Sequence, residues 1–404
     1  MLKKRWIYVF CGFMVFLFLG AALAWSVFVV PIETLYGWTR SQTSLAFTIN
    51  VLCFSVGSIL AGILSKHMTH STLLKVAAVV MLIGFFGASL ITQPWHLYVT
   101  YGFIVGTAIG MGYNCVLSTV PSWLPDKSGT VTGMLLMGYS LSTAIFGPVL
   151  NSLISSVGIV NTFRILGIIC CVGIFLGSIL IRKPTVQEME KLPKPAKNSN
   201  VSSREVETKD MVKLPIYWIY FFVSVLFAGG GMIVLNHCSP ILTESFAVTA
   251  AFAAIVVSMT SITNGVGRFL WGIVYDKIGV VKSLMVVAII FVVSSTGMYI
   301  SFLAGLTYVF IFFVCALMLS YAGNAIMMPA NLRKMFGDQN YSMNYSIFGI
   351  SSIFISTFPT IIGNVQVATG SYNLPLLFEV VVSIIALFVG VLVIKMYNNY
   401  IKES

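Results

Sequence analysis

Charged residues are scarce in this chain of 404 residues: Asp, Glu, Lys and Arg together make up 9% of it. Soluble globular domains carry about 25% charged residues. Hydrophobic residues make up 58%, and apolar runs of 18 or more residues recur along the whole length. So many runs cannot share one soluble core, and each is long enough to cross a bilayer as a helix. The scarcity of charge therefore excludes a soluble domain and predicts a polytopic helical membrane protein.

Clusters that would indicate a metal, redox or catalytic site are also missing. The seven cysteines lie in or beside apolar runs, and none forms a Cys-x-x-Cys pair or accompanies a histidine cluster. No Ser/His arrangement or pair of aspartates within the apolar runs supplies a nucleophile and a base. We therefore expect no metal, no cofactor and no enzymatic activity.

The apolar runs and one polar interruption define the expected architecture. Residues 182–213 are rich in Lys, Glu, Pro, Ser and Asn, and cannot bury enough apolar surface to fold alone. The sequence thus predicts an all-α membrane protein of twelve transmembrane helices, with six-helix halves at 1–181 and 215–404 and a cytoplasmic linker at 182–214. The expected spans are 6–30, 43–65, 72–92, 96–119, 129–153, 160–181, 215–237, 250–275, 281–304, 307–329, 341–366 and 372–396.

The positive charges indicate the orientation. With the N-terminus inside, all of the 23 Lys and Arg residues except Arg40, Arg164 and Arg268 fall on cytoplasmic segments. We therefore expect both termini in the cytoplasm, and the net charge of +11 reflects topology. The expected surroundings are the lipid bilayer, with no nucleic-acid partner, and the expected oligomeric state is a monomer.

One cation stands inside an apolar run. In "SITNGVGRFLWGIVYDKIG" (261–279), Arg268 lies about 12 Å along a helix from the polar turn, near the middle of a core about 30 Å thick. Charges at that depth are costly and usually mark a substrate path. Asn264 shares its helix face at i,i+4, and a guanidinium fits one carboxylate with two hydrogen bonds. The alternative is a structural arginine that extends toward the cytosol.

Two further sets of residues are candidates for conformational coupling. The turn Gly272-x-x-x-Asp276-Lys277 places a carboxylate and a cation at a helix end, where they can hold neighbouring helices together in one state and release them in another. The alternative is an ordinary charged cytoplasmic turn. Glu379 lies near the outer end of the last span, where we expect it to reach water; the alternative is a proton carrier.

Two halves of six helices joined by a polar loop are typical of transporters with a central binding site. Several stretches, among them "GMGYNCVLSTVPSWLPDKSGTVTGMLLMGYSLS" (110–142), "NGVGRFLWGIVYDKIG" (264–279) and "MPANLRKMFGDQNYSMNYSIFGISS" (328–352), resemble the oxalate/formate antiporter family of the major facilitator superfamily. The related monocarboxylate transporters share the general plan. The resemblance covers all twelve predicted spans and implies exchange or proton-linked movement of small carboxylates by alternating access across the bacterial cytoplasmic membrane.

The resemblance also implies site residues. Arg268 matches the family's substrate-binding arginine, and the aromatic positions that match or stand close to the family's binding site are Tyr113, Tyr139, Trp25 and Tyr321. Two positions depart from the family: Phe348 replaces a lysine of the oxalate carrier, and Asn264 stands where monocarboxylate transporters often have an aspartate. One cation where a dicarboxylate would need two argues against oxalate.

We therefore predict a secondary transporter of small organic anions, with monocarboxylates such as formate, lactate or pyruvate as the expected substrates, that works by antiport or proton-linked symport. A proton is the expected second partner if transport is coupled. The alternatives are a carrier of another small metabolite in which Arg268 is structural, and a membrane sensor on the same fold that does not transport.

Overall fold

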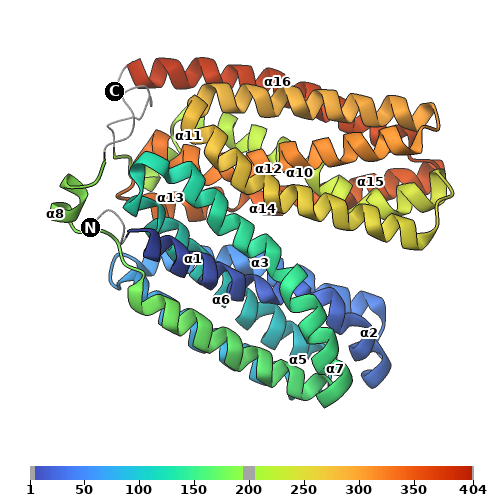
Figure 1. Ribbon diagram of the computed structural model, residues 1–404, viewed down its shortest axis with the longest axis horizontal. Coiled ribbons are helices and arrows are strands. Elements are labelled where there is room, and N and C mark those ends of the chain that lie inside the picture. The colour runs from blue at the N-terminus through green and yellow to red at the C-terminus, as the bar shows by residue number, and fades with distance from the viewer. Residues whose placement is uncertain (1–4, 194–204, 403–404) are drawn as a thin grey trace. The chain divides into compact units, whose positions relative to one another are not determined.

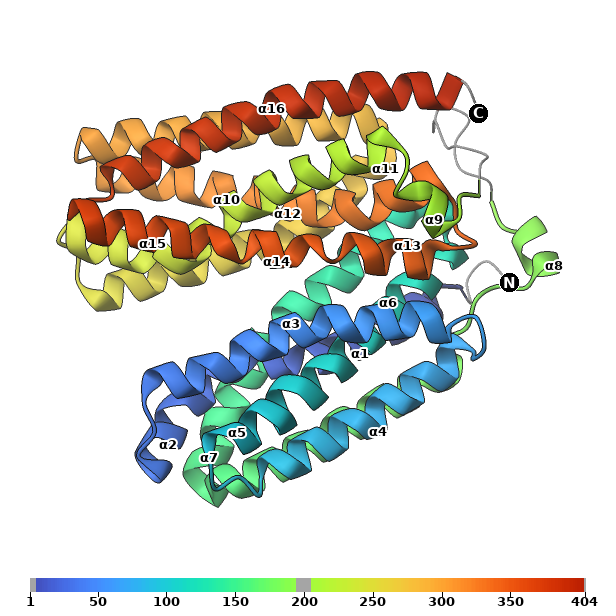
Figure 2. The ribbon, with the colours of Figure 1, turned by 180° about the vertical axis from the view of Figure 1, so that it is seen from behind.

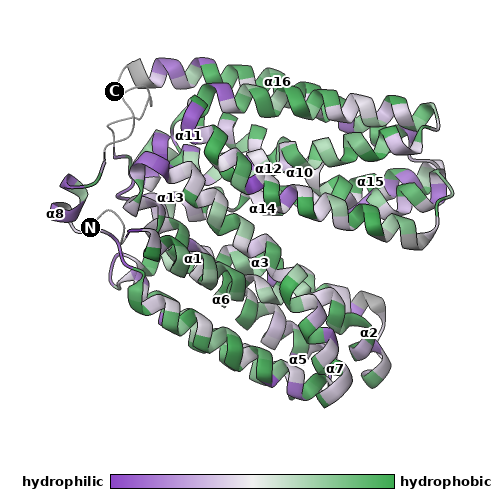
Figure 3. Ribbon diagram, in the orientation of Figure 1, coloured by the Kyte–Doolittle hydropathy of each residue, from purple (hydrophilic) through white to green (hydrophobic). Residues whose placement is uncertain are grey.

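The computed structural model describes residues 5–193 and 205–402. Within these residues every regular element is a helix. Helical residues of the ribbon are predominantly hydrophobic, while α8 and several helix ends are hydrophilic (Figure 3). The part of the predicted linker at 194–204 lies outside the described residues; the rest includes two short helices, α8 (Val186–Glu190) and α9 (Thr208–Met211).

Ten of the described helices are long and apolar enough to cross a membrane. Two of them, Pro125–Leu180 with 56 residues and Ile255–Leu303 with 49, each hold two predicted spans. Inside them, Gly158 and Gly279 both have φ of +78° with extended ψ, so the helical path is broken there. A side chain is strained at such a φ, which is why glycine stands at both turns. Ten helices, two of them double, give the twelve predicted spans.

The chain forms two compact units, one of residues 1–195 with 341–349 and the other of residues 196–340 with 350–404. The first unit (Figures 1 and 2) contains, in chain order, α1 (Arg5–Gly20), η1 (Ala21–Trp25), α2 (Ser26–Tyr36), α3 (Arg40–Leu64), α4 (His70–Ala88), α5 (Pro94–Leu97), the π-helix η2 (Tyr98–Val105), α6 (Gly106–Thr119), η3 (Pro121–Trp123), η4 (Pro125–Lys127), α7 (Ser128–Leu180), α8 and α13 (Tyr341–Phe348).

The second unit consists of α9, α10 (Pro215–Ser245), α11 (Ala250–Leu303), α12 (Thr307–Phe336), α14 (Ser351–Ile355), α15 (Thr357–Thr369) and α16 (Asn373–Lys402). The last helix lies alongside α11 and α10 in both views (Figures 1 and 2). The eleventh predicted span is thus broken into α13, α14 and α15. Its first segment groups with the other unit, because α13 packs on α3 and α6.

Helix starts follow local sequence signals. Thr39 accepts a hydrogen bond from the Gln42 amide, and Gln42 accepts one from the Thr39 amide, which together form a capping box at the start of α3. Thr249 caps α11 in the same way by accepting from the Phe252 amide at 3.3 Å. These two helices are the second and eighth predicted spans, so the corresponding span in each half begins with a threonine cap.

Candidate substrate-binding site

The first helix of the chain is interrupted where Trp25 stands. Ala24 has a non-helical ψ of 22° within the 3-10 segment η1. The Tyr101 hydroxyl, in the π-helix η2, donates to the Ala22 carbonyl at 2.9 Å. A π-helical turn inside an α-helix is frequent at functional sites. This hydrogen bond therefore connects the interrupted segment η1 of the first helix to the π-helix η2.

Trp25 is positioned by that contact. Its ring stacks on Tyr101 with centroids 4.1 Å apart and planes 21° apart, and its side chain is 5% exposed. Its indole Nε1 is buried and has no hydrogen-bond partner in the described part of the chain. Buried indole N–H groups usually have a partner, so the N–H of Trp25 is a donor that the described residues leave unused.

The rings of Tyr113 and Tyr139, two residues that the resemblance assigns to the binding site, lie against each other. Their ring centroids lie 5.3 Å apart in an edge-to-face arrangement. Phe16 contacts both rings, with centroids at 4.7 and 5.9 Å, and Tyr345 of α13 lies parallel to Tyr113 at 6.3 Å. These four residues, called the aromatic cluster below, supply apolar walls and hydroxyl groups of the kind that line small-molecule sites.

Sequence reasoning did not single out Phe16 or Tyr345. Tyr345 lies inside the stretch 328–352, so the resemblance itself contained that signal. On the same short helix, Phe348 is completely buried. The position at which the oxalate carrier has a lysine is therefore apolar and closed to water.

A buried polar network next to the aromatic cluster was also missed. Asn114, completely buried on α6, donates from Nδ2 to the Ser346 hydroxyl at 2.8 Å and the Ser342 carbonyl at 2.9 Å. Ser58 of α3 contacts the same amide through its hydroxyl at 3.0 Å. Ser342 and Ser118 donate to Asn114 Oδ1 at 2.6 and 2.9 Å. This network joins α13 to α3 and α6.

In the second unit, Arg268 and Asn264 form the predicted i,i+4 contact, because Arg268 Nε donates to Asn264 Oδ1 at 3.3 Å. Asn264 is 8% exposed and Arg268 is half-buried. Arg268 precedes the break at Gly279 by eleven residues, about 16 Å of helix, so its backbone lies deep in the predicted span.

Tyr321 belongs to the same unit and packs on α10. A Cβ built at Gly231 would lie 2.1 Å from Tyr321 Cδ2, so the ring occupies the space that a side chain would fill. Next to these residues, Gly267 faces Ala322, where a Cβ would lie 3.0 Å from the alanine methyl. Gly267 is the neighbour of Arg268 on α11, and Ala322 is the neighbour of Tyr321 on α12. Both candidate residues therefore lie beside the point at which α11 and α12 approach closely.

The predicted conformational residues have different surroundings. Asp276 is half-buried and attracts Lys334 of α12, whose Nζ lies 4.3 Å from the centre of the Tyr275 ring. Lys277 is exposed, and Gly272 is buried. Asp276 therefore attracts a cation of another helix, and the strength of this attraction depends on how α11 packs on α12.

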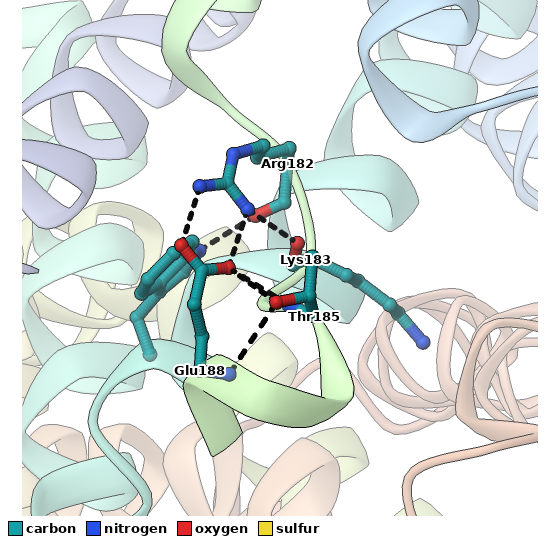
Figure 4. A network of polar contacts seen from close by, with 5 residues as sticks. Arg182, Lys183, Thr185 and Glu188 are labelled. Carbon is teal, nitrogen blue, oxygen red and sulfur yellow. Dashed lines mark hydrogen bonds and ion pairs between the residues drawn. The ribbon is translucent and has the colours of Figure 1, made fainter. Parts of the chain in front are cut away.

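The "W-x-P-D-K" turn that formed part of the resemblance joins the first unit to the start of the linker. The Trp123 indole donates to the Arg182 carbonyl at 2.6 Å, and the Arg182 guanidinium lies 4.9 Å from the Trp123 ring centre. Both terminal nitrogens of Arg182 donate to Glu188 at 2.7 Å, and Thr185 contacts the same carboxylate (Figure 4). The bonds from Arg182, and to a smaller extent those from Thr185, lower the pKa of Glu188 from its ordinary value of 4.5 to about 2.

The expectation that Glu379 reaches water is wrong. Its side chain is completely buried on α16. A Cβ built at Gly230 would lie 2.4 Å from Glu379 Oε1, so the carboxyl lies directly against α10. The tertiary packing of α10 on α16 covers a position that the sequence placed near a span end.

The sequence model that describes the Major Facilitator Superfamily matches this chain at residues 9–238 and 221–400. The chain belongs to the major facilitator superfamily. It is therefore a multi-pass membrane transporter, and the family and fold are not those of an enzyme.

Individual relatives agree with this assignment. The chain is 26% identical to the uncharacterized MFS-type transporter YhjX of Escherichia coli over 87% of this chain and 86% of that one. It is 24% identical to the oxalate:formate antiporter of Oxalobacter formigenes over 100% of this chain and 94% of that one. Among solved structures, the proton:xylose symporter XylE bound to 6-bromo-6-deoxy-D-glucose superimposes with a TM-score of 0.75 at 13% identity, covering 96% of this chain and 95% of that one. The outward conformation of FucP gives 0.70 at 15% identity, covering 96% and 98%.

Proposed function

We propose that this major facilitator transporter carries small monocarboxylates, such as formate, lactate or pyruvate, and that Arg268 binds the carboxylate. The observation that carries the proposal is the Arg268–Asn264 contact in the middle of a transmembrane helix. An arginine at that depth is costly unless it faces a cavity or a partner. The Asn264 carbonyl oxygen, held by Nε, fixes the plane of the guanidinium, and a planar guanidinium binds a carboxylate through two parallel hydrogen bonds.

The preference for a single carboxylate rests on Phe348. This residue is completely buried and apolar at the position where the oxalate carrier has its second cation. A dianion would bring a second carboxylate without a matching positive charge, and an unpaired buried charge is strongly unfavourable. As the resemblance implies, Tyr113, Tyr139 and Trp25 would contribute to substrate binding, the Trp25 indole as a hydrogen-bond donor.

The remaining parts of the proposal concern the transport cycle. Alternating access would move the halves at 1–181 and 215–404, and the attraction between Asp276 and Lys334 would hold one state, with Lys277 and Gly272 in the same turn as Asp276. The protein would lie in the cell membrane as a monomer with both termini in the cytoplasm.

Counterflow in proteoliposomes tests the proposal, with labelled formate, acetate, lactate, pyruvate and oxalate. Arg268→Gln removes the charge-assisted hydrogen bonds, which are worth about 1.5–3 kcal/mol, so we expect roughly ten- to a hundred-fold weaker apparent affinity. Arg164→Gln is the matched control, because Arg164 is also half-buried and Nε-bonded, at 3.2 Å to the Ser89 hydroxyl.

Three results would contradict the proposal. Unchanged uptake by Arg268→Gln would make Arg268 a structural residue. Robust oxalate exchange would refute the preference for monocarboxylates that rests on Phe348. Absence of uptake across the whole panel by the wild type would favour another metabolite, or a sensor that does not transport.

A further inference from the structure

Glu379 is the only buried Asp or Glu residue in the described part of the chain. Both oxygens of its carboxyl group are inaccessible to solvent, and neither has a hydrogen-bond partner there. The surrounding atoms are the backbone of Gly230 and the Phe291 ring: a Cβ built at Gly230 would lie 2.4 Å from Glu379 Oε1 and 2.4 Å from Phe291 Cζ. The carboxyl group and the Phe291 ring therefore both lie against the α10 backbone at Gly230, whose amides are bonded within the helix.

Nearby hydroxyl groups do not supply the missing donor. Ser383, one turn after Glu379, lies 2.7 Å from the Ser295 hydroxyl, and the two hydroxyls lie 2.7 and 3.1 Å from backbone carbonyls that can accept the hydrogen not used between them. Their hydrogen bonds connect α11 to α16 without involving the carboxyl group.

In the described part of the chain, no ion pair neutralises Glu379. On α10, α11 and α16, the other ionisable side chains that flank the site stand at least seven residues, about 10 Å along a helix, from Gly230, Phe291 or Glu379. On α12, Tyr321 packs against Gly231. His237, the nearest on α10, contacts the Pro359 carbonyl through Nε2 at 2.9 Å and packs against the Tyr372 ring. The flanking groups are His237, Cys238, Tyr220 and Glu244 on α10, Lys282 and Tyr299 on α11, Cys315 and Tyr321 on α12, and Tyr372, Lys395 and Tyr397 at or on α16.

Gly230 belongs to a run of three glycines, each of which contacts a different neighbour. The built Cβ positions show that Gly229 faces Phe358 at 2.6 Å, Gly230 faces Glu379, and Gly231 faces Tyr321 at 2.1 Å. Glu379 and the candidate site residue Tyr321 thus pack on successive residues of one helix. A shift of α10 that admits water to the carboxyl group would also change the contact with Tyr321.

From this juxtaposition we propose that Glu379 is the proton-binding site that couples transport to the proton gradient; the inference rests on the proposed function. The carboxyl group is protonated while it packs against Gly230, because an anion without a donor or a cation is unfavourable in apolar surroundings. When α10 moves and water reaches the carboxyl, it releases the proton. One proton bound and released for each carboxylate anion makes the cycle electroneutral.

The experiment compares two assays in proteoliposomes that contain the full chain. Counterflow at equal pH on both sides needs substrate binding and conformational exchange but no proton release, whereas accumulation driven by an inward proton gradient needs both. Glu379→Gln imitates the protonated acid, so we expect counterflow near the wild-type rate and at least a ten-fold loss of gradient-driven accumulation. Glu379→Asp, which retains a carboxyl group, should keep the accumulation. Glu244→Gln, the same change at an exposed position of α10, should behave as the wild type.

Gradient-driven accumulation by Glu379→Gln at the wild-type level would overturn the proposal. If the wild type shows no counterflow with any carboxylate, the proposed function fails, and the proton site is tested separately by infrared spectroscopy. The wild-type minus Glu379→Gln difference spectrum at pH 7 should contain the carbonyl band of a protonated carboxyl group, and its absence would overturn the proposal. Where Glu379→Gln does not fold, the shift of that band in Glu379→Asp gives the same test.

Discussion

Asn114 connects three helices of the first unit, and its removal has a consequence that can be calculated. The side chain is completely buried on α6. Its amide nitrogen lies within 3.0 Å of three oxygen atoms, those of the Ser58 hydroxyl, the Ser342 carbonyl and the Ser346 hydroxyl. Its carbonyl oxygen accepts from Ser342 and Ser118. Asn114→Ala removes every one of these contacts and leaves the serines buried.

The magnitude follows from the number of bonds that one amide can make. An amide nitrogen donates two hydrogen bonds at a time and the Asn114 oxygen accepts two, so about four bonds are lost. Three of these bonds join Asn114 to another helix, because Ser118 lies on α6 itself. Hydrogen bonds between transmembrane helices average about 0.6 kcal/mol, so we expect a loss of about 1.8 kcal/mol. A domain of 150–250 residues loses about 2–4 °C in Tm per kcal/mol, which corresponds to a decrease of about 4–7 °C.

The assay is thermal unfolding of the purified protein in one detergent, with Asn161→Ala as the control. Asn161 is exposed, and its amide nitrogen donates to the Val157 carbonyl of its own helix. Surface substitutions of that kind usually stay within about 0.5 kcal/mol. If Asn114→Ala unfolds within about 1 °C of Asn161→Ala, the network does not stabilise the packing of α13, and the reasoning is refuted.

Two further predictions concern the packing of α10 and the start of the linker. Gly231→Ala places a methyl group 2.1 Å from the Tyr321 ring; the ring must move, so we expect weaker substrate affinity in counterflow while Gly147→Ala, a site with open space around its Cβ, remains like the wild type. The lowered pKa of Glu188, about 2, means that its bonds to Arg182 persist above its ordinary pKa of 4.5 and are lost only as the pH falls toward 2. Glu188→Gln should therefore leave the shape of the pH profile of uptake between pH 5 and 8 unchanged, and an altered profile would contradict this assignment.

Much of the fold could be predicted because a bilayer imposes simple length and charge rules on a sequence. Apolar runs long enough to span a membrane predicted the twelve spans. Where two predicted spans fall within α7 or α11, the break at Gly158 or Gly279 separates them. The Arg268–Asn264 contact was also predictable, since residues four apart on a helix share a face whatever the tertiary structure. The sequence already shows that Phe348 replaces the lysine of the oxalate carrier. The structure adds that this side chain is completely buried, so the position is closed to water.

Other features depend on which helices pack together, and no local pattern encodes that. Tyr345 and Asn114 acquire their partners only because α13 packs with α3 and α6. Glu379 looked like a residue near a span end, yet the glycine run of α10 allows a close approach that covers its carboxyl group. The sequence by itself determined the class, the number of spans and the intramembrane arginine, because these depend on hydrophobicity and helix period alone. Only the tertiary structure decided which polar groups are paired and which carboxyl is left in apolar surroundings, because burial depends on neighbours that are distant in the sequence.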